Sequence, residues 1–121
     1  MALRMTGDEF DNVVYTALQR MPQWVSDAFD NLELVILDRA GAELDPDGDG
    51  LLGLYVGTPL PERDANHAGE LPDVIYLFRQ PHFDLNLDRV ALEDEIVTTL
   101  VHEVAHYFGL DEARVHELGW G

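Results

Sequence analysis

The chain has 121 residues, 46% of them hydrophobic, which is typical of one globular domain and excludes a mainly disordered chain. It contains no cysteine, so disulfides and thiolate metal sites are excluded, and any zinc would need histidine and carboxylate ligands. Lys and Arg number 7 against 24 Asp and Glu, and the resulting net charge of −17 argues against nucleic acid or an anionic membrane as a partner.

The first part of the chain predicts two helices. Thr6 and Glu9 have the spacing of a capping box, and apolar residues recur at helical spacing from Glu9 to Met21. Pro22 suits the first turn of a second helix, which we expect to run to about Phe29.

Three short segments predict strands, because they are apolar and rich in β-branched or aromatic residues. They are residues 31–38 (NLELVILD), 51–56 (LLGLYV) and 73–79 (DVIYLFR). Pro81 interrupts the last pattern, and we expect only a weak helix or turn from there to about Asn86.

A long amphipathic helix is predicted for residues 88–108. Its apolar residues recur at helical spacing, and we expect Val101, Val104 and Phe108 to face the core. The opposite face of this helix is then left for a cleft.

Gly109 is placed to end the long helix, and a last short helix is expected over residues 111–118. The predicted helices and strands are grouped rather than strictly alternating. The sequence therefore favours a compact α+β fold, in a single domain over residues 1–121, rather than a doubly wound α/β sheet.

Membrane-spanning and export segments are not predicted. The sequence has no run of about 18 apolar residues, and it turns acidic at Asp8 before the apolar core of a signal peptide could form. We therefore expect a soluble, cytoplasmic protein.

The long predicted helix carries an HExxH pattern, in which His102, Glu103 and His106 are the defining residues. Residues four apart project from the same side of a helix, so both imidazoles can reach one metal ion. Glu103 lies roughly 100° further round the helix, beside the metal position. That position suits a general base acting on a zinc-activated water. The simpler alternative is a surface helix with two histidines that bind nothing.

A third protein ligand is needed, because catalytic zinc sites use three and leave the fourth position open. After Gly109 the chain can reverse and bring the next residues back toward the metal, which makes Asp111, Glu112 and His116 candidates. In the long motif HExxHxxGxxH the last ligand falls three residues after the glycine, and this count favours Glu112. Asp111 and Glu112 would also stabilise the N-terminus of the last helix.

The segment HEVAHYFGLDEARVHELGW, together with LPDVIYLFR, LLGLY and ERDANHAG, resembles the minimal zincin-like metallopeptidases, or mini-zincins. The resemblance runs from about Leu32 to the C-terminus. It implies a compact α+β domain with a small β-sheet packed beside an active-site helix. It also implies one zinc ion in an Asp-zincin site with the motif HExxHxxGxxD. Four positions match this motif and Glu112 stands where the family has Asp; the matching residues are His102, Glu103, His106 and Gly109.

The leading hypothesis is a zinc-dependent metallopeptidase acting on peptide or protein substrates. Zinc would be held by His102, His106 and Glu112, with Glu103 as the general base. The alternative is a non-catalytic zinc-binding module of zincin ancestry, which the short chain and the departure at Glu112 favour.

Two further features of a zincin site stay open in the sequence. An edge strand beside the active-site helix would pair with extended substrate, and the resemblance allows either residues 51–56 or residues 73–79 for this part. Residues that stabilise the developing oxyanion are not evident, and Tyr107 and His116 are candidates by residue type alone.

Other candidate ligands and site residues receive simpler interpretations. Asp45–Gly50 resembles the first half of a calcium loop, but Val56 stands where the bidentate glutamate belongs, so we expect a solvated acidic turn rather than a Ca²⁺ site. We expect His67 in a loop and His82 in a structural role. Trp120 would anchor the C-terminus or form an apolar floor for the site.

Overall fold

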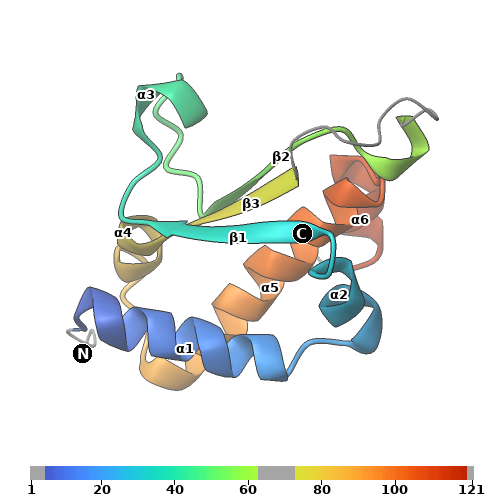
Figure 1. The fold of residues 1–121 in the computed structure, drawn as a ribbon. Coiled ribbons are helices and arrows are strands. Elements are labelled where there is room, and N and C mark those ends of the chain that lie inside the picture. Colours follow the sequence, from blue (N-terminus) through green and yellow to red (C-terminus); the bar gives the residue numbers. More distant parts are fainter. Residues whose placement is uncertain (1–4, 63–72, 120–121) are drawn as a thin grey trace.

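Strands and helices separate into two layers (Figure 1). The structure, a computed structural model, describes residues 5–62 and 73–119. Along that part of the chain the elements are α1 (Gly7–Gln19), α2 (Gln23–Ala28), β1 (Leu32–Leu37), α3 (Gly41–Leu44), β2 (Gly53–Val56), the 3-10 turn η1 (Leu60–Glu62), β3 (Asp73–Phe78), α4 (Arg79–Phe83), α5 (Arg89–Tyr107) and α6 (Glu112–Glu117). The strands form one layer, and α1, α2 and α5 lie together on one side of it. The α+β class expected from the sequence is confirmed.

The sheet has the order β1-β3-β2, with β1 parallel and β2 antiparallel to the central strand β3. The Leu52 carbonyl accepts a hydrogen bond from the Phe78 N–H at 3.0 Å, which fixes how β2 faces β3. Because hydrogen-bonded and non-hydrogen-bonded pairs alternate in an antiparallel ladder, the backbone groups of Gly53 and Tyr55 point away from β3. They lie on the edge of β2 that pairs with no other strand among the described residues.

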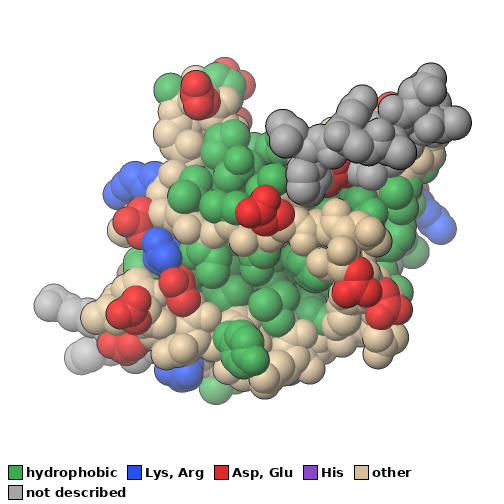
Figure 2. Space-filling model, viewed as in Figure 1, with side chains coloured by type: hydrophobic (Ala, Val, Ile, Leu, Met, Phe, Trp, Pro, Cys, Tyr) green, Lys and Arg blue, Asp and Glu red, His purple; other side chains and the backbone are tan. Residues whose placement is uncertain are grey.

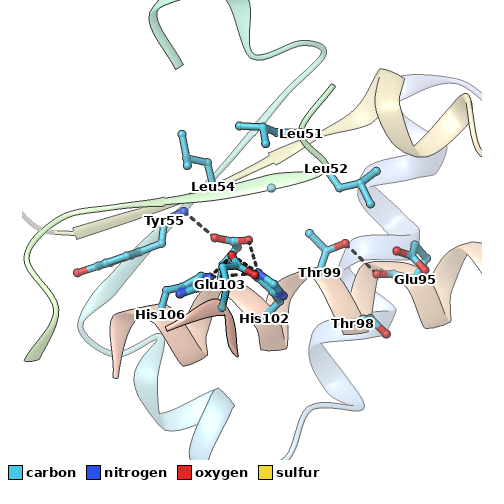
Figure 3. A pocket seen from close by; sticks show the side chains of 12 residues that line it. Leu51, Leu52, Leu54, Tyr55, Glu95, Thr98, Thr99, His102, Glu103 and His106 are labelled. Atoms are coloured by element: carbon cyan, nitrogen blue, oxygen red, sulfur yellow. Dashed lines mark hydrogen bonds and ion pairs between the residues drawn. The ribbon is translucent and has the colours of Figure 1, made fainter. Parts of the chain in front are cut away.

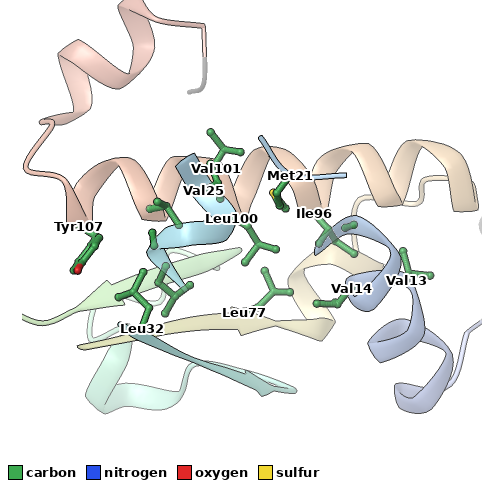
Figure 4. Close-up of a cluster of buried hydrophobic side chains, with 14 of the residues drawn as sticks. Val13, Val14, Met21, Val25, Leu32, Leu77, Ile96, Leu100, Val101 and Tyr107 are labelled. Carbon is green, nitrogen blue, oxygen red and sulfur yellow. The ribbon is translucent and has the colours of Figure 1, made fainter. Parts of the chain in front are cut away.

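The hydrophobic core fills the space between the sheet and the helices (Figure 4). Burying one large apolar side chain contributes roughly 1.5–3 kcal/mol, so the contact between α5, α1 and β3 holds the long helix in a fixed position. The core residues of these three elements include Phe10, Val13, Val14, Ile75, Leu77, Ile96, Leu100 and Val104.

The inward face of α5 differs from the prediction at the C-terminal end. Val101 and Val104 are buried as expected, but Phe108 is 37% exposed and its ring packs against Trp24, with centroids 5.8 Å apart. Tyr107 is buried in its place. Phe108 is the C-cap of the helix, where the chain turns away from the sheet, so periodicity no longer decides which side chain faces the core.

Two short helices were not predicted as they stand. The weak helix or turn expected from Pro81 is α4, which begins two residues earlier at Arg79; Pro81 fits inside it because the first turn of a helix needs no backbone N–H from a proline. Helix α3 has four residues, too few for an apolar period to be visible. Among the other elements, β2 begins at Gly53, two residues later than predicted.

The acidic turn Asp45–Gly50 is closed on itself. The Asp45 carboxylate accepts hydrogen bonds from the backbone N–H groups of Asp49 and Gly50, both at 2.9 Å. The Asp49 hydrogen bond in particular holds the pKa of Asp45 below its usual value. This geometry agrees with the expected acidic turn, since the Asp45 carboxylate is hydrogen-bonded to backbone N–H groups of its own loop.

The surface carries few cations. Figure 2 shows acidic side chains around a band of hydrophobic side chains that runs between the sheet and the helices. Of the helices described, none is both long and apolar enough to cross a lipid bilayer.

Candidate metal centre

The two histidines of the HExxH pattern lie on one face of α5, directed toward β2 (Figure 3). Their ring centroids are 4.8 Å apart, and the Nε2 atoms of His102 and His106 approach to 3.1 Å. The helix alone accounts for this, because residues four apart are neighbours on its surface.

The end of α5 orients His106. The Gly109 N–H bonds to the His106 carbonyl at 2.9 Å and the Leu110 N–H to the Ala105 carbonyl at 3.1 Å, which is the Schellman pattern of helix termination. Gly109 has a φ of +90°, a conformation that glycine adopts without steric cost. The turn brings the Leu110 carbonyl to 2.8 Å from His106 Nδ1, which donates to it. Nδ1 therefore carries the proton, and Nε2 is left with a free lone pair.

The same turn brings the start of α6 back to the histidines. Asp111 is the N-cap of α6 and accepts a hydrogen bond from the Arg114 N–H at 2.8 Å, so its carboxylate is used within the helix. Glu112 Oε1 instead lies 2.8 Å from His106 Nε2 and 3.1 Å from His102 Nε2. Burial opposes the shift, but the two neighbouring imidazoles lower the pKa of Glu112 below its usual value.

Three potential ligand atoms thus converge, from His102, His106 and Glu112, all within 4.8 Å of one another. Within the described ranges, neither Asp111 nor His116 joins this group. Of the three candidates for a third ligand, the structure brings Glu112 to the histidines.

The donor set fits zinc. With zinc–ligand bonds of about 2.0–2.1 Å, neighbouring ligand atoms in a tetrahedron are about 3.3–3.4 Å apart. The three pairwise distances, 2.8, 3.1 and 3.1 Å, lie close to this spacing. Two imidazoles and one carboxylate are also ligand types that zinc prefers, and a catalytic zinc site uses three protein ligands.

Glu103 lies beside this group but outside it. Its side chain is almost completely buried, Oε1 accepts a hydrogen bond from the Tyr55 N–H at 2.9 Å, and Oε2 lies 3.9 Å from His102 Nε2. Burial raises the pKa of the Glu103 carboxyl, and the electrostatic effect of the two neighbouring imidazoles partly opposes this. The orientation agrees with the position predicted from helix geometry.

A cavity of about 480 Å³ lies over this face of α5. Residues 51–55 form one wall, and the other is formed by α5 together with Glu112 (Figure 3). Gly53 allows the two walls to approach, because a Cβ there would lie 2.7 Å from Thr99 Cγ2 and 3.1 Å from the Tyr76 carbonyl oxygen.

Sequence reasoning missed Gly53 and Tyr55. Glycine inside a strand pattern often marks close approach of another backbone or side chain, and that signal could have indicated Gly53. No sequence signal could have indicated the role of the Tyr55 N–H, because every residue except proline has a backbone N–H. The Tyr55 hydroxyl also donates to Asp73 at 2.5 Å, which ties β2 to the start of β3.

The remaining sequence candidates lie elsewhere. Tyr107 is buried with its ring against Tyr55, at a centroid distance of 5.9 Å, and His116 is exposed on α6. His67 and Trp120 lie outside the described residues.

Comparison with known proteins identifies the family to which the chain belongs. The model of the family described as zincin-like metallopeptidase matches residues 29–120, which include every element from β1 to α6. No curated protein matches the chain significantly. The family match covers most of the chain and includes the converging histidines and glutamate. The chain belongs to the zincin-like metallopeptidase family.

Proposed function

We propose that this metallopeptidase-family protein is an active zinc-dependent peptidase that hydrolyses peptide bonds, with Glu103 as its general base. The observation that carries the proposal is the position of Glu103. Its buried carboxylate faces the cavity next to three converging ligand atoms and lies opposite an open strand edge.

His102, His106 and Glu112 would hold the zinc ion. The bound zinc would supply Lewis acidity, which activates water as a nucleophile and polarises the scissile carbonyl. The Leu110 carbonyl supports this role of His106 by fixing the ring and its tautomer through Nδ1.

Glu103 would take the proton of the attacking water and deliver it to the leaving amine. Burial raises the pKa of its carboxyl, which makes the carboxylate a stronger base than an exposed glutamate. The Tyr55 N–H fixes Oε1, so that Oε2 is directed to the side of the histidines. The two carboxylate oxygens of Glu103 would therefore have different roles: Oε1 is held by β2, and Oε2 would transfer the proton.

Strand β2 would bind the substrate backbone. The other strand considered, β3, is central in the sheet, and both of its edges are occupied. The backbone groups of Gly53 lie beside the cavity, on the edge of β2 that faces away from β3 and pairs with no other strand among the described residues. An extended peptide could add to this edge as a further strand, which is a common mode of peptide recognition.

The test compares the wild type with Glu103→Gln, measuring bound zinc and peptide hydrolysis on the same preparations. We expect about one zinc in each protein and a kcat lowered by about 10²–10⁴-fold in the variant, since general base catalysis contributes that much. Glu117→Gln is the matched control, because Glu117 is exposed on α6 and pairs with Arg114 at 3.0 Å, away from the cavity.

Other outcomes separate the alternatives. Zinc in both proteins without cleavage of a broad peptide library would favour a non-catalytic zinc-binding module. If neither protein takes up zinc when it is added, both hypotheses are wrong.

A further inference from the structure

The cavity continues past the three ligand atoms toward the N-terminal part of α5, and Glu95 lies at that end (Figure 3). Glu95 precedes His102 by seven residues, which corresponds to about 10.5 Å along a helix axis. Tyr55 and His106 lie at the opposite end. The cavity thus has a metal-binding end and a carboxylate end.

Among the described residues, the Glu95 carboxylate forms no interaction that would explain its place in the fold. Across residues 5–62 and 73–119 its carboxylate has no hydrogen-bond or ion-pair partner, although the residue is half-buried. Thr99 donates to the backbone carbonyl of Glu95, not to its carboxylate. The other two carboxylates of the cavity, Glu103 and Glu112, are each bound by neighbouring groups.

The walls beside Glu95 are largely apolar. Leu52, with Leu51 next to it in the chain, lines one side, and Thr98 and Thr99 line the other. A partly buried carboxylate at the end of an apolar passage suits a long aliphatic stem that ends in a positive charge, because the stem is desolvated against carbon while the charge is paired.

We propose that Glu95 selects a substrate lysine or arginine next to the scissile bond. The proposal rests on the proposed peptidase function and names its substrate class. A lysine or arginine carries its charge roughly 6–7 Å from its Cα, and that Cα lies roughly 1.5–2.5 Å from the scissile carbonyl carbon. The sum, roughly 7.5–9.5 Å, leaves room for a hydrogen bond at one end within the rise of about 10.5 Å between Glu95 and His102 along α5.

A free N-terminal amine is a poorer fit for the same carboxylate. The amine of the residue that supplies the scissile carbonyl lies only roughly 2.5 Å from the carbonyl carbon. It would stay at the metal-binding end of the cavity. The net charge of −17 also attracts cationic peptides at long range, in agreement with a basic substrate.

The first experiment measures kcat/KM on N-acetylated peptides that differ at a single position flanking the cleaved bond. That position carries Lys, Arg, norleucine or Glu, and norleucine matches the lysine stem without the charge. We expect the wild type to prefer Lys and Arg over norleucine by about tenfold or more, as for a charged hydrogen bond. Glu95→Gln should bring this ratio close to one, and Glu95→Lys should make the Glu peptide the best substrate.

Asp94→Asn is the matched control. Asp94 is the neighbouring residue on α5, exposed and paired with Arg20 at 2.9 Å, and it lies outside the cavity. The substitution removes the same charge from the molecule, so it reports any effect of net charge alone. We expect the Lys-to-norleucine ratio to stay at the wild-type value.

The second experiment measures binding without cleavage. In the zinc-loaded Glu103→Gln protein, the acetylated Lys peptide should bind about tenfold tighter than the norleucine peptide, and adding Glu95→Gln should remove the difference. Binding that depends on Glu95 in a wild type that cleaves nothing would support recognition of a basic side chain by Glu95 and make the peptidase proposal wrong. Cleavage without a basic preference, a preference that survives Glu95→Gln, or one that needs a free N-terminus would overturn the inference alone.

Discussion

His106 illustrates how residues that follow a side chain in the sequence decide its chemistry. Its Nδ1 donates to the Leu110 carbonyl at 2.8 Å, and that carbonyl is in reach because Gly109 turns the chain with φ +90°. A Cβ on Gly109 would lie 2.5 Å from Pro61 Cγ, so the turn is also packed against η1. The tautomer that directs Nε2 toward the ligand group therefore depends on a glycine three residues away.

Glu112 and Asp111 are adjacent carboxylates with different contacts, and this gives a sharp test of the ligand assignment. Glu112→Gln should weaken zinc affinity by about 100-fold or more, since even groups that only orient a ligand contribute 10–100-fold. Asp111→Asn should leave zinc affinity unchanged, because asparagine caps a helix as well as aspartate does. Affinities measured by competition with a chelator would decide between them.

The opposite result would be informative. Undiminished affinity in Glu112→Gln together with a loss in Asp111→Asn would make Asp111 the ligand. Undiminished affinity in both variants would direct attention to His116.

At the scale of elements, the site depends on how closely β2 lies against α5. Gly53 is opposite Thr99, and Tyr55 donates its N–H to Glu103 from the same strand. The strand edge, the cavity wall and one hydrogen bond of the proposed base all follow from this single contact. A small displacement of β2 would alter all three together.

Gly53→Ala tests that contact. The new methyl group would lie 2.7 Å from Thr99 Cγ2 and 3.1 Å from the Tyr76 carbonyl oxygen, so we expect the free energy of unfolding to fall by about 1–3 kcal/mol. Thr99→Ser removes the Cγ2 atom and keeps the hydroxyl. The double variant should therefore recover part of the loss, measured by urea denaturation as a double-mutant cycle. Strictly additive losses would contradict the proposed steric contact.

At the scale of the whole molecule, His82 connects several elements from a fully buried position. Its Nδ1 lies 2.7 Å from the Phe78 carbonyl oxygen and its Nε2 lies 3.2 Å from Thr99 Oγ1. Its ring also packs against Phe10 of α1, with centroids 5.6 Å apart. Burial lowers the pKa of His82, against the opposing effect of the Phe78 carbonyl.

This burial predicts a loss of stability in mild acid. Below the ordinary histidine pKa of about 6.5 the unfolded chain binds a proton that the folded His82 does not, so the free energy of unfolding falls as the pH decreases through that range. The slope contributed by one histidine is at most about 1.4 kcal/mol per pH unit. Urea denaturation between pH 7.5 and 5.5 should show a steeper fall for the wild type than for His82→Gln.

The comparison removes the other titrating groups, which are common to both proteins. His82→Gln is expected to be less stable than the wild type throughout, and only the slope bears on the prediction. Equal slopes in the two proteins would mean that His82 titrates in the folded protein as it does in the unfolded chain.

Features that local geometry governs could be predicted from the sequence. The fold class followed from the grouping of helical and strand patterns, and the pairing of His102 with His106 followed from a spacing of four residues on a helix. Gly109 marked the end of α5 because a left-handed turn residue is nearly always glycine. The family match over residues 29–120 agrees with the resemblance that these motifs indicated.

Contacts between distant segments could not be predicted from the sequence, because they depend on how the layers pack. The sequence allowed either of two strands beside the helix, and in the order β1-β3-β2 it is β2 that has an edge without a partner strand among the described residues. The sequence predicted that Phe108 faces the core, but the chain turns at that residue and Tyr107 is buried instead. The hydrogen bond from Tyr55 to Glu103 spans 48 residues, and no local pattern encodes a contact that arises from packing one layer on another.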